Sequence, residues 1–159
     1  MSQAALTGGC QCGAVRFRAE RLGRAAICHC RMCQKQFGSF YGPFVTGLGV
    51  VWTRGAPKYF HSSNMGRRGF CADCGTPLTF EMDDDMELAI GALDDPRLAA
   101  PVLQVNPQDK LPFVDVIPEL PTRPASEKAP LDVRVAGFVN YQHPDHDTAV
   151  WPPTGEFRG

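Results

Sequence analysis

The stretch Cys28-His29-Cys30-Arg31-Met32-Cys33 places three thiols within six residues. Two shorter clusters flank it, Cys10-Gln11-Cys12 upstream and Cys71-Ala72-Asp73-Cys74 downstream, and together the three hold all seven cysteines of the chain. An odd number of thiols cannot all form disulfides within one chain, and clustered thiols in a reducing compartment are typical of metal sites. The pattern therefore predicts a fold organised around bound metal.

The length and composition favour a mainly β protein. A chain of 159 residues, 43% of them hydrophobic, can bury a core of its own. Its 14 prolines and 16 glycines interrupt the sequence often, which disfavours a helix bundle and favours short strands joined by turns. We expect antiparallel strands with short helical turns, followed by a proline-rich C-terminal extension.

The charge and hydropathy patterns argue against two classes of partner. The formal net charge is -1 and no block of Lys and Arg stands out, so a nucleic-acid partner is not expected. No apolar run approaches the roughly 20 residues of a membrane span, and the N-terminus lacks the charged and hydrophobic regions of a signal peptide. We expect a cytoplasmic protein with no membrane partner, and a homo-oligomer is compatible with the sequence.

Short β-prone stretches separate the cysteine clusters and continue after them. The expected strands cover residues 14–19, 25–27, 39–45, 50–52, 58–61, 86–90 and 102–105. Residues 67–70 lead into the last cysteine pair and residues 75–80 lead out of it. Residues 34–37 predict a helical turn that ends at Gly38. We expect a hairpin tip at residues 83–85 and a capped helical turn at Asp94-Asp95-Pro96. Residues 118–130 predict a proline-rich linker, and residues 133–139 a further strand.

The number of thiols carries the main functional clue. Zinc takes four ligands in a tetrahedron, and thiolates suit it. Seven thiols cannot fill two such sites, so one site is closed and the other lacks one protein ligand. A closed site is usually structural, whereas an open position is what a catalytic zinc needs.

Spacing alone leaves two ways to divide the thiols. One joins Cys30 and Cys33 to Cys71 and Cys74 and leaves the other three over. The second joins Cys10, Cys12, Cys71 and Cys74 and leaves Cys28, Cys30 and Cys33 as a compact set. Locality favours the second division, because three near neighbours form a site without closing a long loop.

Three motifs resemble one known family. They are Gly8-Gly9-Cys10-Gln11-Cys12-Gly13-Ala14-Val15-Arg16-Phe17, Cys28-His29-Cys30-Arg31-Met32-Cys33 and Phe70-Cys71-Ala72-Asp73-Cys74-Gly75-Thr76-Pro77-Leu78. In this order they resemble the glutathione-dependent formaldehyde-activating enzyme (GFA) family, to which the centromere protein V domain also belongs. The resemblance covers about residues 6–121.

The resemblance implies an antiparallel β-tent fold and two zinc ions per chain. It assigns Cys10, Cys12, Cys71 and Cys74 to a structural zinc, and Cys28, Cys30 and Cys33 to a second, open zinc. The implied reaction forms or cleaves the carbon–sulfur bond of S-hydroxymethylglutathione, with glutathione as the thiol. We divide the chain into a zinc-binding domain, residues 1–124, and an extension, residues 125–159, that packs on this domain or on a partner subunit.

The charge of the open site points to the same chemistry. Three thiolates give a zinc centre a formal charge of -1, which weakens its ability to ionise water for hydrolysis. An incoming thiol suits this position better, because zinc converts it to a thiolate that stays nucleophilic. The prediction is a carbon–sulfur lyase acting on a thiol–aldehyde adduct. The alternative is a non-catalytic, zinc-stabilised module that binds a partner protein.

Three further residues are candidates for the site. His29 lies between two expected ligands, where it serves as a proton shuttle or points away from the metal. Arg67 and Arg68 precede the last cysteine pair, where they either bind carboxylates of the thiol substrate or offset thiolate charge.

Overall fold

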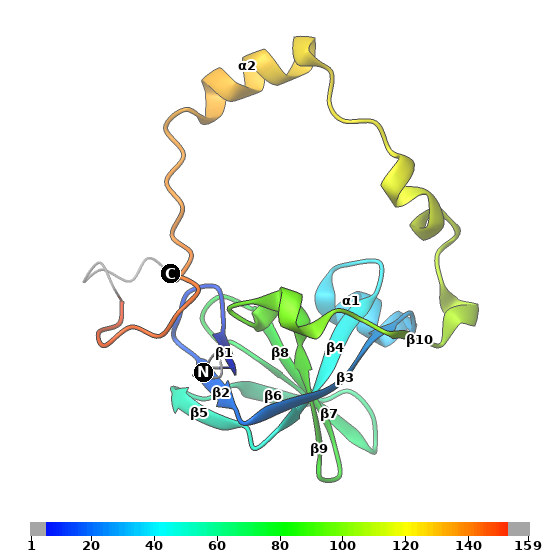
Figure 1. Ribbon diagram of the computed structural model, residues 1–159, viewed down its shortest axis with the longest axis vertical. Coiled ribbons are helices and arrows are strands. Elements are labelled where there is room, and N and C mark those ends of the chain that lie inside the picture. The colour runs from blue at the N-terminus through cyan, green and yellow to red at the C-terminus, as the bar shows by residue number, and fades with distance from the viewer. Residues whose placement is uncertain (1–5, 153–159) are drawn as a thin grey trace.

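The computed structural model describes residues 6–152, which form two β-sheets (Figure 1). The smaller sheet has the strand order β1-β2-β5 and the larger one the order β10-β3-β4-β9-β8-β7-β6. The strands are β1 (Leu6–Gly9), β2 (Arg16–Ala19), β3 (Arg21–Cys28), β4 (Gly42–Leu48), β5 (Val51–Arg54), β6 (Lys58–His61), β7 (Gly66–Phe70), β8 (Pro77–Met82), β9 (Asp85–Ala89) and β10 (Leu103–Val105). The mainly β fold predicted from the sequence is confirmed.

The helices are short. There are two α-helices in the described residues, α1 (Arg31–Phe37) and α2 (Ala125–Val135). The 3-10 helices are η1 (Ile90–Ala92), η2 (Pro96–Ala99), η3 (Pro107–Asp109) and η4 (Pro112–Glu119). None of the helices within residues 6–152 has the length and hydrophobicity needed to cross a bilayer.

Strand pairing is antiparallel throughout the described sheets except at one edge. There β10 runs parallel to β3, with Leu103 opposite Ala26 and Val105 opposite Cys28. This parallel pair is an exception within the antiparallel fold that the family resemblance implied. It brings residues 103–106 beside the Cys28–Cys33 cluster, although Leu103 follows Cys33 by 70 positions in the sequence.

The hydrophobic core draws on both sheets, because alternate residues of a strand point to opposite faces. Phe17 of β2, Val45 of β4 and Leu88 of β9 are fully shielded from solvent. The neighbours of Val45 and Leu88 in sequence therefore point to the other face of the large sheet. Thr46 and Glu87 are among these, and that face becomes the floor of a cavity.

Several local predictions hold. Gly38 ends α1 in a left-handed conformation, with φ of 56°, and its N–H is bonded to carbonyls of the last helical turn. Asp83 occupies the tip of the β8–β9 hairpin with φ of 52°. The Asp95 carboxylate accepts a hydrogen bond from the backbone N–H of Arg97 and so caps η2.

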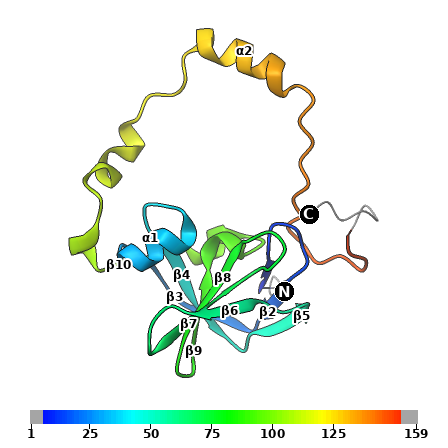
Figure 2. The ribbon, with the colours of Figure 1, turned by 180° about the vertical axis from the view of Figure 1, so that it is seen from behind.

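Residues 114–141 form an arch that leaves the sheets near α1 and returns to the other end of the molecule (Figures 1 and 2). Its middle is α2, none of whose residues is buried. The predicted strand over residues 133–139 is wrong, and the predicted linker over residues 118–130 is wrong in its last part, because α2 covers it. Ala, Glu, Lys, Leu and Arg favour this helix, and it tolerates Pro130 in its interior.

The chain then returns to the first cysteine pair as a C-terminal tail, residues 142–152. The backbone N–H of His143 donates to the Gln11 carbonyl at 2.8 Å. The indole Nε1–H of Trp151 donates to the Cys12 carbonyl at 2.7 Å. The tail is therefore bonded to the turn that carries two of the predicted metal ligands.

Candidate metal and substrate site

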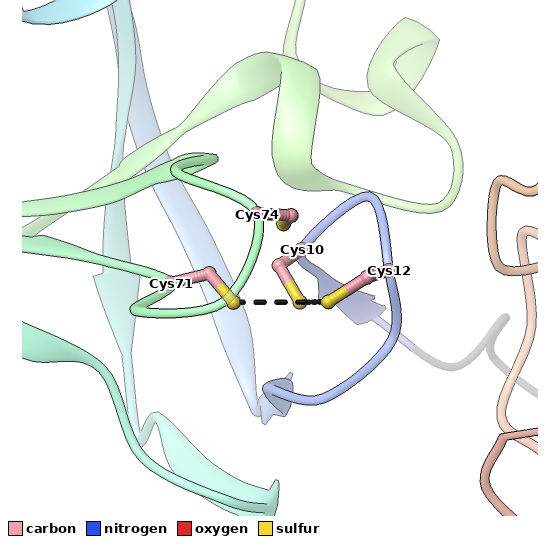
Figure 3. Close-up of side chains that lie close together, drawn as sticks. All are labelled: Cys10, Cys12, Cys71 and Cys74. Atoms are coloured by element: carbon pink, nitrogen blue, oxygen red, sulfur yellow. Dashed lines mark hydrogen bonds between the residues drawn. The ribbon is translucent and has the colours of Figure 1, made fainter. Parts of the chain in front are cut away.

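The first group of thiols, the quartet, comprises Cys10, Cys12, Cys71 and Cys74, which converge from two turns (Figure 3). Their sulfur atoms all lie within 4.8 Å of one another. The Cys10 and Cys12 sulfurs are 3.5 Å apart, and those of Cys12 and Cys71 are 3.8 Å apart. Four sulfurs at the usual zinc–sulfur distance would be separated by about 3.8 Å. The quartet therefore fits a tetrahedral zinc ion.

The two turns of the quartet are built alike. After Cys10 the chain folds back so that the Gly13 N–H donates to the Cys10 carbonyl at 3.0 Å, and Gly13 has φ of 82°. After Cys71 the Gly75 N–H donates to the Cys71 carbonyl at 2.9 Å, and Gly75 has φ of 77°. A side chain rarely adopts this left-handed backbone, so glycine is required at both positions. The knuckle predicted at Gly75 is confirmed.

The electrostatics of the quartet call for a cation. Burial raises the pKa of Cys71 to about 11 and also raises the pKa of Cys12. Burial opposes ionisation of Cys74 as well, but hydrogen bonds from Thr76 outweigh it and lower the pKa of Cys74 to about 7. Four thiolates cannot share this space without a positive ion, so the donor set suits a metal that binds soft anionic sulfur.

The second group, the trio, consists of Cys28, Cys30 and Cys33, whose sulfurs also lie within 4.8 Å of one another. Cys28 ends β3, Cys30 directly precedes α1, and Cys33 lies in the first turn of α1. All seven cysteines are free thiols. The structure thus groups the thiols by the second of the two divisions left open by their spacing, as four and three.

Two polar side chains donate to trio sulfurs. The guanidinium of Arg68 donates to the Cys33 sulfur at 3.5 Å, and the Asn106 amide donates to the Cys28 sulfur at 3.6 Å. Hydrogen bonds from Cys33, and then from Cys30 and Asn106, outweigh burial and lower the pKa of Cys28 to about 5. The same hydrogen bond to Cys28, together with burial, raises the pKa of Cys33. The trio is therefore prepared to carry one negative charge, centred on Cys28.

All three thiols of the trio open into one cavity of about 450 Å³. One face of the large sheet forms its floor, and Met32 of α1, Ser62 and Ser63 also line it. Apolar side chains dominate the floor and walls: Ala26, Phe44, Phe80, Met82, Leu103 and Val105. A ligand bound at the trio would therefore lie in a largely apolar hollow on the sheet.

Comparison with known families agrees with this geometry. The model of the glutathione-dependent formaldehyde-activating enzyme family matches residues 5–109, which include every cysteine of both groups. The chain belongs to the GFA family. Members of this family include enzymes of the carbon–sulfur lyase type, and the match ends before the arch begins. No curated protein matches the chain.

The two candidate residues Arg67 and Arg68 have different surroundings from each other. Arg68 is 2% exposed, lines the cavity and lies over the Phe80 ring. Arg67 points to the other side of β7, where it forms an ion pair with Glu81 at 2.7 Å and lies over the Tyr59 ring. Adjacent residues of a strand face opposite ways, so only one of the two arginines can serve the trio.

His29 is buried and does not line the cavity. Its Nε2 lies 2.8 Å from the side-chain oxygen of Gln104, and its backbone N–H donates to the Val105 carbonyl at 2.9 Å. Its Nδ1 is buried and has no hydrogen-bond partner among residues 6–152. The proton shuttle predicted for His29 stays a prediction, and these contacts instead join the trio segment to β10.

The structure also brings to the candidate site residues that the sequence did not indicate. Asn106 donates to Cys28 from a left-handed backbone with φ of 52°, and it reaches the trio only because β10 pairs with β3. Arg24, Thr46 and Glu87 line the cavity away from the thiols. Arg24, Thr46 and Glu87 belong to strands of the large sheet, so their grouping follows from strand register and not from any local motif.

Proposed function

We propose that this protein is a zinc-dependent carbon–sulfur lyase that forms or cleaves a thiol–aldehyde adduct such as S-hydroxymethylglutathione. The observation that supports this proposal is the trio, a set of three thiols facing a cavity large enough for a small organic thiol. The quartet would hold a structural zinc and the trio a second zinc. When bound by the trio, zinc would supply a positive centre with room for one more sulfur ligand.

The reaction balances without a redox partner. In the forming direction, the thiol sulfur bonds to the aldehyde carbon, the carbon–oxygen double bond becomes single, and the thiol proton ends on that oxygen. In the cleaving direction the same bond breaks and the proton returns to sulfur. Glutathione fits the family name as the thiol, and a cytoplasmic location fits the free cysteines.

The side chains around the trio hold charge and exclude water. Arg68 donates to Cys33 while its remaining nitrogens contact Ser62 and Gln36, which fixes the guanidinium plane. A cation beside three thiolates lowers the cost of gathering negative charge in an apolar hollow. The buried ring of His29, bonded to Gln104, keeps β10 and its Asn106 beside the trio. We therefore propose a positioning role for His29.

Arg68→Lys tests this role for the guanidinium. Lysine keeps the charge but loses the planar fork that reaches three partners at once. We expect kcat/KM for adduct formation to fall about tenfold, the value of one hydrogen bond to a charged group. Arg67→Lys is the matched control, because Arg67 is the adjacent residue of β7 and faces the opposite side of the strand. Equal loss in both variants would contradict the assignment.

The central experiment compares the zinc-loaded protein with its Cys30→Ser variant. Exchange between free glutathione with formaldehyde and their adduct is followed by NMR exchange spectroscopy, together with zinc content per chain. We expect two zinc ions and accelerated exchange in the wild type, and one zinc and the buffer rate in the variant. A wild type with two zinc ions and no acceleration for any thiol tested would refute the lyase proposal.

A second candidate function, a zinc-stabilised binding module, is favoured by the arch. Val133 and Phe138 there are 80% and 77% exposed, respectively. Such a module would use residues 125–159 to bind another protein or a second copy of the chain, and it would need no metal at the trio. The same experiment separates the candidates, because one zinc per chain and the buffer rate in the wild type would favour the module.

A further inference from the structure

The cavity of the trio has a second, polar end. Along β4, Gly42 lies opposite Cys28, and Thr46 four residues later lies opposite Glu87 of β9. Four residues of a strand span about 13 Å. A bulge in β3 between Leu22 and Ala25 places Arg24 at this same end, and all three polar side chains line the cavity. The thiols and the polar group therefore face each other along one hollow.

The polar end carries both signs of charge. The Glu87 carboxylate is half-buried and accepts a hydrogen bond from the Thr46 hydroxyl at 2.9 Å. Arg24 is exposed, and within residues 6–152 neither Arg24 nor Glu87 forms a close ion pair with another side chain. A half-buried charge without such a partner is costly unless a ligand compensates it. Burial accordingly raises the pKa of Glu87, with Thr46 and Arg24 acting in the opposite direction.

We propose that Glu87, held by Thr46, and Arg24 bind the zwitterionic head of an α-amino acid carried by the thiol substrate. The carboxylate of Glu87 receives the ammonium group, and the guanidinium of Arg24 receives the carboxylate, which its planar fork suits. This inference rests on the proposed function for the position of the sulfur. It identifies Glu87, Thr46 and Arg24 as the residues that select a thiol by its amino-acid head.

The distance sets the length of the substrate. If the backbone span of about 13 Å along β4 is taken as the separation of the two ends, a metal–sulfur bond takes about 2.3 Å of it and a hydrogen bond to the head about 2.9 Å. About 8 Å remains, which two to three extended residues span. Ala26 and Phe44 face each other across β3 and β4 between the two ends, so the connecting part of the thiol would lie against apolar surface. Free cysteine is too short to reach both ends, whereas a γ-glutamyl peptide thiol is long enough.

The test uses Glu87→Gln and Arg24→Gln in the zinc-loaded, full-length protein. Matched controls are Asp84→Asn, at the tip of the β8–β9 hairpin, and Arg21→Gln, at the start of β3, neither of which lines the cavity. Binding of S-methylglutathione, whose sulfur cannot react, is measured by titration calorimetry. Adduct formation is measured with glutathione and with 2-mercaptoethanol, which has no amino-acid head.

We expect each cavity variant to weaken S-methylglutathione binding, and to raise KM for glutathione, about tenfold. Rates with 2-mercaptoethanol should change less than about twofold, and the controls should match the wild type. Unchanged binding in Glu87→Gln, or an equal loss for both thiols, would overturn the inference. Weakened binding in a protein that accelerates no adduct reaction would support the amino-acid site while refuting the lyase proposal.

Discussion

The ion pair between Arg16 and Asp94 provides the sharpest stability prediction. The Arg16 side chain is 3% exposed and that of Asp94 is 12% exposed. Two guanidinium nitrogens donate to the two carboxylate oxygens at 2.8 and 2.5 Å, and the Thr7 hydroxyl donates to the same carboxylate at 2.6 Å. The guanidinium also contacts Asp147 of the tail at 2.8 Å, but that carboxylate is 49% exposed. One arginine thus has a buried and an exposed partner.

Substitution of the two carboxylates should have very different costs. Asp94→Asn leaves a buried cation without its main counter-charge, which should lower the free energy of unfolding by about 3 kcal/mol. Asp147→Asn removes a half-exposed charge and should cost no more than about 1 kcal/mol. In a domain of this size, 3 kcal/mol corresponds to a drop of about 6–12 °C in melting temperature.

The assay is urea unfolding of the zinc-loaded protein at several pH values. Arg16 and Thr7 outweigh burial and lower the pKa of Asp94, so its contribution to stability is complete above the ordinary carboxyl pKa and is lost only as the pH falls through the lowered value. The difference between wild type and Asp94→Asn should therefore stay constant from about pH 6 to pH 8. Equal costs for the two variants, or a difference that varies over this range, would refute the reasoning.

Three further predictions concern the metal groups and the tail. Cys74→Ser should remove one zinc per chain and lower the melting temperature markedly, whereas Cys33→Ser should remove the other zinc with a much smaller change; metal analysis and melting curves check both. Gly75→Ala should cost about 1 kcal/mol because only its backbone is strained, but Gly13→Ala should cost about 2 kcal/mol or more, since its new methyl group would overlap the His143 ring. Equal urea midpoints for the two glycine variants would contradict this difference. Trp151→Phe should cost about 1 kcal/mol by removing the donor to Cys12, and faster proteolysis of the tail is the expected readout.

The sequence allowed much of the metal-binding part to be predicted, because the signals there are local. Gly38 and Gly75 adopt the expected left-handed conformations, and Asp95 caps its helix as expected. Spacing alone left two divisions of the thiols open, and locality favoured the observed one, with Cys28, Cys30 and Cys33 together. Each of these features depends on a few neighbouring residues, so a short stretch of sequence contains the necessary information.

The rest depends on contacts between distant segments. Asn106 reaches Cys28 through a parallel strand pair that no local pattern indicates. Strand periodicity implies that Arg67 and Arg68 face opposite ways, but only the structure shows which one contacts the trio. Because residues 118–130 are rich in proline, the sequence predicts a linker there and does not predict α2. The backbone of His143 contacts the first cysteine pair, which lies more than a hundred residues earlier in the chain.

The arch has a consequence for how this protein would respond to a protease. Residues 118–142 are exposed apart from the half-buried Leu131, so a protease can cut the chain there. The cut would produce two fragments held together only by the hydrogen bonds of the tail to the first cysteine pair. Before the cut, the intact backbone keeps the tail at an effective concentration in the millimolar range. After the cut, the association of the two fragments becomes bimolecular, and dilution alone would break the hydrogen bond from the Trp151 indole to the Cys12 carbonyl. A nicked sample should therefore elute as one species when concentrated and as two when dilute.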